Sequence, residues 1–398
     1  MPPKIVVTGM GIISSIGNSV EANFYALTHK RTGLSVIENL VTAHKNNIRV
    51  GEVKLDNNQL AEKLHLPIVN AYSRTSLLGI IAVKEAIANA NLTPKQLGNA
   101  GFINASTVGG MDMTERYFFE YENSESVRRY ITTHNIGDVT HQIADYFRLK
   151  GIVTSVSTAC SSSANAIITA AHLLTTGRAD CLIVGGSDAL SKFTINGFNS
   201  LMILSDSECT PFDAHRKGLN LGEAAAYLVL ETEENALRRG AKIKAVLSGW
   251  GNANDAYHQT ASSEDGQGAY LALQQALQIA HLQPETIDYI NAHGTATPNN
   301  DLSESRALLR VFGECVPHYS STKPFTGHTL GAASSVEAVF SVMALRNDIV
   351  FPNLNYQTPM SEVPIRPETE LLHLPVRHVL SNSFGFGGNC SALIFSKK

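Results

Sequence analysis

The chain has 398 residues, of which 43% are hydrophobic and 17% charged, and its formal net charge is −4 at pH 7. This balance excludes a strongly basic nucleic-acid-binding protein, and the composition excludes a disordered, collagen-like or coiled-coil chain. Five cysteines lie far apart, at positions 160, 181, 209, 315 and 390. Their odd number and the lack of a C-x-x-C pair predict free thiols in a reducing, cytoplasmic compartment, without disulfides or structural zinc.

The N-terminal segment predicts a buried strand rather than a targeting signal. Its apolar run, IVVTGMGII (5–13), is short and interrupted by Thr8 and two glycines, and no small-residue cleavage site follows. No apolar stretch reaches the roughly 20 residues of a membrane-spanning helix, so we expect no membrane insertion. Gly9 and Gly11 begin a dinucleotide-binding pattern, but Ser14 replaces the third glycine of G-x-G-x-x-G, which argues against an NAD-dependent oxidoreductase.

Two parts of the chain repeat the same order of elements. Residues 101–107 (GFINAST) and 288–294 (DYINAHG) share Ile-Asn-Ala within a strand-like apolar run. Each run is followed by a turn and a helix rich in Ala and Ser, at 156–174 and at 325–345, with apolar residues at helical spacing. Similar elements in the same order predict a duplicated α/β chain with two packed sheets.

The duplication divides the chain into an N-terminal half, 1–238, and a C-terminal half, 239–398. The first half carries additional residues around 111–148, where YFFEYENSESVRRY is aromatic and charged. An insertion of this kind usually lies on the surface, where it lines a pocket or an interface.

Cys160 stands out among the cysteines because it lies where a turn enters a predicted helix, with Ser157 and Thr158 as candidate caps. A helix N-terminus presents free N–H groups and partial positive charge, which predicts a lowered pKa for the Cys160 thiol and a nucleophilic role. The other four cysteines lie in strand-like or loop-like stretches and are interpreted as bystanders.

Two histidines are expected to face Cys160. His293 follows the repeated strand of the second half, and His328 takes the place there that Cys160 has in the first. A thiol can hold an acyl group, and neutral imidazoles can donate hydrogen bonds to an enolate formed by loss of CO₂. The glycine-rich turn at 382–388 predicts a close approach of backbone to the thiol.

Four separated motifs together resemble the β-ketoacyl-acyl carrier protein synthases of the Cys-His-His class, which are elongating condensing enzymes of the thiolase fold. The motifs are TACSSS (158–163), NAHGTATP (291–298), STKPFTGHTLGAASSVE (321–337) and NSFGFGG (382–388). The resemblance covers nearly the whole chain. It implies an α/β, thiolase-like fold, in which two duplicated halves form a layered αβαβα sandwich.

The resemblance implies a decarboxylative Claisen condensation in fatty-acid elongation. An acyl group on Cys160 would react with malonyl-acyl carrier protein to give 3-oxoacyl-acyl carrier protein and CO₂. The N–H groups of Cys160 and Phe386 would form the oxyanion hole, and His293 and His328 would bind the malonyl thioester. Lys323 would keep both imidazoles neutral, because a nearby cation disfavours protonation of histidine.

Further residues receive supporting roles from the same resemblance. Glu337 would pair with Lys323, and no cofactor is required because the carrier protein brings the phosphopantetheine. Thr295 and Thr297 would hold the pantetheine arm, and Phe384 and Phe386 would line the gate of the acyl pocket. The residues implied around a structural Na⁺ or K⁺ are Asn291, Ala292, Glu337, Ser381 and Asn382.

The implied partners are an acidic acyl carrier protein, for which Arg128 and Arg129 are candidate contacts, and a second subunit. The fold class implies dimer contact across the strand at 180–186. Departures such as Gly218-Leu219-Asn220 resemble type II polyketide or aryl-polyene ketosynthases, so a heterodimer with a chain-length partner is the alternative to a homodimer.

Three other function classes fit the sequence less well. A serine hydrolase lacks its G-x-S-x-G motif, and a thiolase would use a second cysteine, for which Cys390 is a candidate in an unsuitable context. A non-catalytic chain-length partner would lack the cysteine, whereas this chain retains Cys160.

Overall fold

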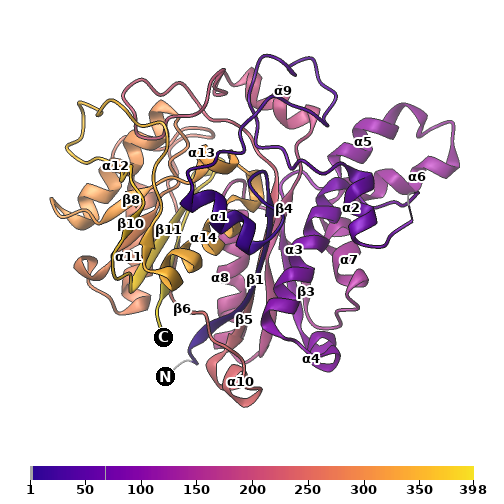
Figure 1. The fold of residues 1–398 in the computed structure, drawn as a ribbon, viewed down its shortest axis with the longest axis horizontal. Coiled ribbons are helices and arrows are strands. Elements are labelled where there is room, and N and C mark those ends of the chain that lie inside the picture. The colour runs from indigo at the N-terminus through magenta and orange to yellow at the C-terminus, as the bar shows by residue number, and fades with distance from the viewer. Residues whose placement is uncertain (1–2, 68) are drawn as a thin grey trace.

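The computed structural model describes residues 3–67 and 69–398, and ten of their strands form one mixed sheet made of two similar halves (Figure 1). The N-terminal half has the spatial order β3 (Val153–Val156), β2 (Gly101–Ala105), β4 (Cys181–Asp188), β5 (Ala224–Thr232) and β1 (Ile5–Ser14). The C-terminal half has the order β8 (His318–Ser320), β7 (Tyr289–Asn291), β11 (His378–Phe384), β12 (Asn389–Ser396) and β6 (Ala245–Asn254). Taken in chain order, the strands of each half occupy matching positions, which confirms the predicted duplication.

The two halves are joined edge to edge rather than as separate sheets. The beginning of β1 pairs antiparallel with β6 through Ile5–Val7 and Ala245–Leu247. Because β1 also pairs with β5, a continuous ladder of hydrogen bonds runs through both halves. The expectation of two sheets is therefore adjusted to two five-stranded halves of one sheet. The boundary at residue 238 stays a prediction.

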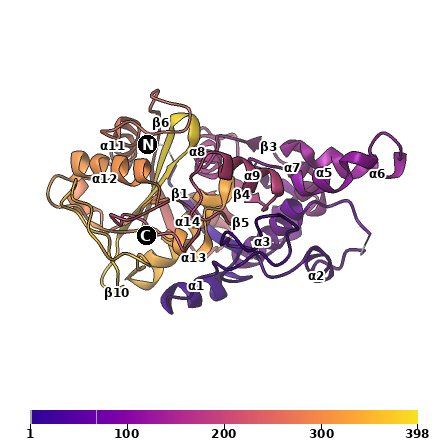
Figure 2. The same ribbon diagram turned by 90° about the horizontal axis from the view of Figure 1, so that it is seen from above.

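Five layers result from the way the helices cover the two halves (Figure 2). Helices α8 (Ser162–Thr175) and α14 (Ala333–Asn347) lie in the middle and contact strands of both halves. The outer faces are covered by α3 (Arg74–Ala90) and α7 (Ile136–Tyr146) on one half, and by α11 (Gln267–Ala280) and α12 (Pro298–Phe312) on the other. Residues 333–345 of α14 are all buried, as expected for a helix enclosed on every side. The predicted αβαβα arrangement is confirmed.

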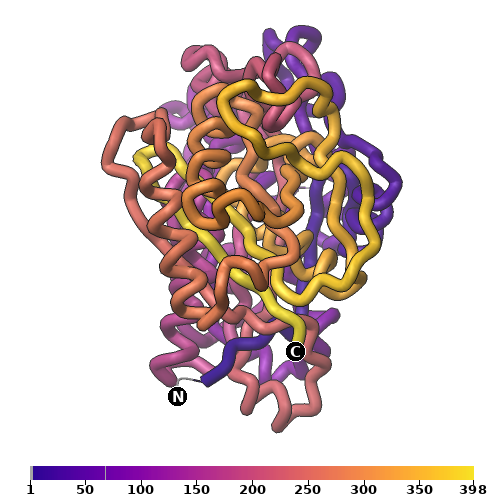
Figure 3. The backbone as a smooth tube through the Cα atoms, turned by 90° about the vertical axis from the view of Figure 1, so that its left-hand side faces the viewer, coloured from indigo at the N-terminus to yellow at the C-terminus, as the bar shows by residue number. Residues whose placement is uncertain are grey.

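Shorter elements complete the chain, and the inserted segment extends to one side. The remaining helices and strands are α1 (Val20–Thr28), α2 (Asn57–Lys63), α4 (Pro94–Asn99), α5 (Met111–Tyr117), α6 (Glu125–Ile131), α9 (Lys192–Ser200), α10 (Glu233–Arg238), α13 (Lys323–Thr326), β9 (Ile349–Val350) and β10 (Leu372–His373). Helices α5 and α6 lie at the end of the molecule opposite α11 and α12 (Figure 2). The beginning of β1 and the end of β12 lie at the same end of the molecule (Figure 3).

The strand predicted to mediate dimer contact lies inside the sheet. Strand β4 pairs with β2 on one side and with β5 on the other, so both of its edges are occupied. The prediction that residues 180–186 mediate the dimer contact therefore names the wrong strand. The outer edge of the N-terminal half is β3, which pairs only with β2 within the described part of the chain. No helix among the described residues is long and apolar enough to cross a membrane.

Candidate active site

Cys160 lies in a sharp turn between β3 and α8. Ala159, immediately before it, has a left-handed φ of 53°, an uncommon conformation for a residue other than glycine. Ser161, rather than the predicted Ser157 or Thr158, occupies the cap position of α8, and its side chain does not cap the helix. Its hydroxyl oxygen instead lies 2.7 Å from both the carbonyl oxygen of Thr158 and Asn389 Oδ1, which share its single proton. These contacts hold the turn against strand β12.

Burial dominates the electrostatics of the thiol. Cys160 is 7% exposed, and burial raises its pKa to about 11, although Lys323 and the N–H groups of Phe386 and Cys160 lower it. The expected lowering of the pKa at a helix start is therefore wrong, because removal from water outweighs the nearby positive groups. The same two N–H groups lie against the sulfur, where an oxyanion on an attached acyl group would form.

Gly385 allows the Phe386 backbone to approach the nucleophile. A Cβ atom at Gly385 would lie 2.9 Å from the carbonyl oxygen of Thr158 and 3.3 Å from the backbone nitrogen of Cys160. Its φ of −109° is ordinary, so space rather than backbone conformation requires glycine here. The close approach expected from the glycine-rich turn is seen at this residue.

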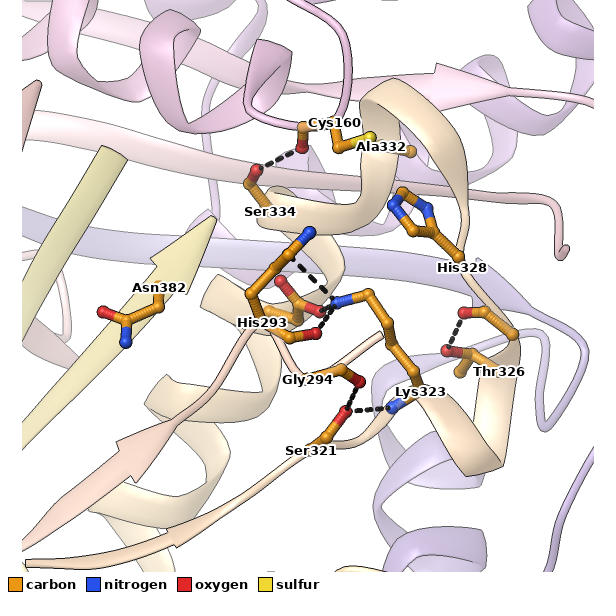
Figure 4. A network of polar contacts seen from close by, with 12 residues as sticks. Cys160, His293, Gly294, Ser321, Lys323, Thr326, His328, Ala332, Ser334 and Asn382 are labelled. Carbon is orange, nitrogen blue, oxygen red and sulfur yellow. Dashed lines mark hydrogen bonds and ion pairs between the residues drawn. The ribbon is translucent and has the colours of Figure 1, made fainter. Parts of the chain in front are cut away.

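His293 and His328 lie side by side near Cys160, with ring centroids 5.6 Å apart and planes at 88° (Figure 4). The N–H of Leu330 donates to His328 Nδ1 at 3.1 Å, and Lys323 Nζ lies 3.3 Å from His293 Nδ1. Each Nδ1 therefore serves as an acceptor, which leaves Nε2 as the protonated nitrogen of a neutral ring.

Lys323 and Glu337 form a buried ion pair behind the histidines, at 2.5 Å, with Lys323 2% and Glu337 3% exposed. Lys323 Nζ also donates to the carbonyl oxygen of His293 at 2.5 Å. Burial, followed by the charge of Lys323, lowers the pKa of His328 to about 3 and that of His293 well below its usual value. Both imidazoles are therefore neutral near pH 7.

Two carboxylates that the sequence analysis missed hold the loop carrying His293. Glu304 accepts the N–H groups of His293 and Gly294 at 2.9 and 2.8 Å. Asp301 accepts the N–H of Ala296 at 3.1 Å. Both carboxylates project from α12, and their i, i+3 spacing directly after NAHGTATP places them on one helix face. That spacing was the signal available in the sequence.

The loop carrying His328 packs against residues 220–222. The N–H of His328 donates to the carbonyl oxygen of Asn220 at 2.7 Å, and the N–H of Gly222 donates to the carbonyl oxygen of His328 at 2.9 Å. A Cβ atom at Gly222 would lie 2.1 Å from the carbonyl oxygen of Thr326, so only glycine fits. The segment that departs from the usual motif thus supports a candidate catalytic histidine.

Two cavities meet at Cys160. The first has a volume of about 260 Å³, and its lining includes the predicted residues Cys160, His293, Thr295, Thr297, His328, Phe384 and Phe386. The hydroxyls of Thr295 and Thr297 lie 2.8 Å apart. The second cavity, of about 360 Å³, shares Cys160, Phe198, Leu201 and Phe386 with the first. Phe198 and Phe386 stack with centroids 6.0 Å apart, which makes them a partition between the cavities.

Comparison with known proteins identifies the family. Family models described as "Beta-ketoacyl synthase, N-terminal domain" and "Beta-ketoacyl synthase, C-terminal domain" match residues 3–236 and 244–357. The chain belongs to the beta-ketoacyl synthase family. The synthase is 34% identical over 409 residues to 3-oxoacyl-[acyl-carrier-protein] synthase 2 of Staphylococcus aureus (strain COL), covering 99% of this chain and 98% of the relative.

Solved structures agree with this membership. The ishigamide ketosynthase/chain length factor superposes with a TM-score of 0.93 at 29% identity and full coverage of both chains. A type II polyketide synthase acyl-carrier protein in complex with its ketosynthase gives a TM-score of 0.90 at 26% identity, again with full coverage of both chains. The predicted resemblance, the thiolase-like fold and the reaction class are confirmed, and the synthase is a condensing acyltransferase.

The residues predicted around a monovalent cation lie on β7, β11 and α14, apart from Ala292, which directly follows β7. Asn291 and Ser381 are paired neighbours on β7 and β11. Buried polar atoms of Asn291, Glu337, Ser381 and Asn382 have no hydrogen-bond partner among the described residues. Orphaned buried oxygens are costly unless something binds them, and oxygen ligands suit a hard cation. The described residues contain no group of three or more His, Cys, Asp or Glu side chains that could hold a metal ion.

Arg128 and Arg129 lie away from the other predicted site residues. Both belong to α6, at the far end of the inserted segment (Figure 2). The Arg128 guanidinium lies over the ring of Tyr121, and that of Arg129 lies over Tyr130. Neither arginine lines either of the cavities at Cys160.

Proposed function

We propose that the synthase carries out its condensation in two half-reactions at Cys160. The observation that supports this most directly is one cavity lined by a thiol and by two histidines that burial and a buried lysine keep neutral. In the first half-reaction, the sulfur of Cys160 attacks the acyl thioester on a carrier protein. The N–H groups of Cys160 and Phe386 stabilise the oxyanion. The carrier thiol then leaves with the proton from Cys160, and the acyl group stays on the enzyme.

The second half-reaction forms the carbon–carbon bond. The Nε2–H groups of His293 and His328 donate to the carbonyl oxygen of the malonyl thioester. The bond to the malonyl carboxylate breaks, CO₂ leaves, and the electron pair forms an enolate that these hydrogen bonds stabilise. The enolate carbon attacks the acyl thioester, and Cys160 leaves as a thiolate that takes up one proton. Since the electron pair comes from the lost carboxylate, no general base is needed.

The lining of the two cavities supports a division of the substrate between them. The second cavity has the more apolar lining, including Val108, Phe198 and Leu330, which suits an acyl chain attached to Cys160. Thr295 and Thr297 line the first cavity, and their hydroxyls bind the amides of the pantetheine arm in this proposal. Phe384 and Phe386 line the first cavity together with Cys160 and act as the gate of the acyl pocket. The partner is an acyl carrier protein, and Arg128 and Arg129 remain candidate contacts for it.

The pathway is fatty-acid elongation, with a type II polyketide or aryl-polyene system as the second candidate. The curated relative favours the first, and the full-length match to a ketosynthase/chain length factor favours the second. The second subunit is a copy of this chain in the first case and a chain-length partner in the other. Free cysteines throughout the chain support a cytoplasmic location.

A structural Na⁺ or K⁺ bound by Asn291, Ala292, Glu337, Ser381 and Asn382 belongs to the same proposal. Its support is the set of buried side-chain oxygens of Asn291, Glu337, Ser381 and Asn382 that lack a hydrogen-bond partner in the part of the chain that the structure describes. Replacing Na⁺ and K⁺ by choline at constant ionic strength should lower the Tm of the protein, and Ser381→Ala should weaken that dependence. A Tm that does not respond to the cation would refute the site.

Intact-mass spectrometry tests the catalytic proposal. Wild-type protein mixed with acyl carrier protein thioesters should gain the mass of the acyl group, and Cys160→Ala should not. Cys390 lines the same cavity as Cys160, so Cys390→Ala is the matched control and should still be acylated. His328→Ala should be acylated but should not condense with malonyl carrier protein. Failure of the wild type to form an adduct with both saturated and polyenoyl donors would refute the proposal.

A further inference from the structure

A buried carboxylate outside the predicted site joins a loop of the N-terminal half to the turn that follows His328 in the C-terminal half. Asp188 is the last residue of β4 and is fully buried. Its partners among the described residues are hydroxyl and peptide N–H groups, with no cation among them. Burying a carboxylate costs desolvation free energy, which these hydrogen bonds offset. Because the bonds are directional, they also fix the positions of the groups that donate them.

One side of Asp188 holds the loop that follows β2. Its Oδ1 accepts the Ser106 hydroxyl at 2.5 Å and the N–H of Val108 at 3.3 Å. Thr107 donates its hydroxyl to Oδ2 at 2.7 Å and its N–H to both oxygens. Thr107 and Val108 also line the second cavity beside Cys160.

The other side of Asp188 holds the turn that follows His328. The N–H of Gly331 donates to Asp188 Oδ2 at 2.7 Å. A Cβ atom at Gly331 would lie 2.8 Å from the same oxygen, so the turn is pressed against the carboxylate. Leu330, one residue earlier, has a left-handed φ of 54° that a residue with a side chain adopts only when it is held in place.

That turn also sets the tautomer of His328. The N–H of Leu330 donates to His328 Nδ1, and this bond directs the ring proton to Nε2. If the Leu330–Gly331 turn relaxed, Nδ1 would lose its donor and the proton could occupy either nitrogen. We propose that Asp188 is a positioning residue for His328, which holds this turn so that Nε2 carries the hydrogen-bond donor toward the malonyl thioester. The inference rests on the proposed role of His328 in condensation.

Asp188→Asn tests the inference, because both oxygens of Asp188 face peptide N–H groups and an amide nitrogen cannot accept from them. We expect acylation of Cys160 within about threefold of wild type, because that step does not use His328. We expect the rate of condensation with malonyl carrier protein to fall roughly 10- to 100-fold. This fall is smaller than, or similar to, the one caused by removing an entire oxyanion-hole donor. An equal fall in both half-reactions would mean general structural support and would overturn the positioning role.

A spectroscopic readout separates positioning from packing. ¹⁵N spectra of histidine-labelled protein, with the His328→Gln variant identifying the His328 signals, report which ring nitrogen carries the proton. Wild type should show Nε2–H alone, and Asp188→Asn should show a mixture of the two tautomers. An unchanged tautomer in that variant would overturn the inference.

Two controls keep the inference apart from the proposed function. Ser106→Ala removes a donor to the same carboxylate but leaves the Gly331 contact, so condensation should stay within about threefold of wild type. His328→Ala should abolish condensation. If His328→Ala still condenses, the proposed function fails; if it does not and Asp188→Asn condenses normally, only the present inference fails.

A second variant addresses the same turn if Asp188→Asn does not fold. Leu330→Gly keeps the N–H donor but relieves the left-handed strain, so the turn becomes freer to move. In this variant, acylation of Cys160 should again stay near the wild-type rate while condensation falls, and His328 should again show both tautomers. Wild-type condensation together with a single His328 tautomer in Leu330→Gly would overturn the inference.

Discussion

Gly385→Ala should damage the oxyanion hole without removing any catalytic group. The added Cβ atom would lie 2.9 Å from the carbonyl oxygen of Thr158, whereas ordinary contacts begin at 3.4 Å. The loop must therefore move by about 0.5 Å away from the nucleophile turn. Because the next residue is Phe386, its N–H moves away from the position where the oxyanion forms.

The size of the effect follows from this displacement. Removing one oxyanion donor typically slows a reaction 10²- to 10³-fold, and a misplacement of about 1 Å can cost 10²-fold. A shift of about half that distance should slow acylation of Cys160 by between tenfold and a hundredfold. Because the φ of Gly385 suits any residue, the loss of stability should stay within the roughly 1–3 kcal/mol typical of overpacking.

The assay is single-turnover acylation, followed by intact mass after mixing with an acyl carrier protein thioester. Alkylation of Cys160 by iodoacetamide forms no oxyanion and loses only the support that the Phe386 N–H gives the thiolate, so in Gly385→Ala its rate should fall less than the rate of acylation. Gly98→Ala is the matched control, because a Cβ atom there meets nothing within 4 Å. Acylation of Gly385→Ala within about twofold of wild type would refute the assignment of the Phe386 N–H to the oxyanion hole.

Three further predictions concern charge. Since burial holds the pKa of Cys160 near 11, its alkylation rate should rise about tenfold per pH unit from pH 7 to 10, and a plateau below pH 9 would contradict this. Lys323→Met leaves the Glu337 carboxylate buried without its partner and should lower the free energy of unfolding by about 3–5 kcal/mol in urea titrations, whereas the double variant Lys323→Met/Glu337→Leu should recover part of the loss. His328 stays neutral in the folded protein down to a pKa of about 3, while the unfolded chain takes up a proton near 6.5, so stability should fall as the pH drops through this window. The full loss is on the order of 5 kcal/mol, and His328→Gln should show a shallower acid dependence.

The sequence by itself indicated the thiol and the two histidines of the candidate site and the order of the elements, but not the carboxylates of Asp301 and Glu304. Cys160 was indicated by its place where a turn enters a helix, His293 by its place after the repeated strand, and His328 by the position that matches Cys160 in the second half. Such patterns are local in the chain. The duplicated topology followed from the same repeat. The strands and helices of each half do lie in matching positions.

Only the tertiary structure decided the properties that depend on distant neighbours. Burial sets the direction of the Cys160 pKa shift, and no local sequence pattern reports burial. The position of Cys160 at a predicted helix start therefore suggested a lowered pKa, whereas the pKa is raised. The edge strand is β3 rather than β4, because strand pairing is decided by segments far apart in the chain. Asp188 reaches Gly331 across 143 residues of sequence, so its contact with the turn after His328 exists only in the folded chain. Residue types and their spacing can be read from short stretches of the sequence. Desolvation and non-local hydrogen bonds, in contrast, arise only when the two halves close around α8 and α14.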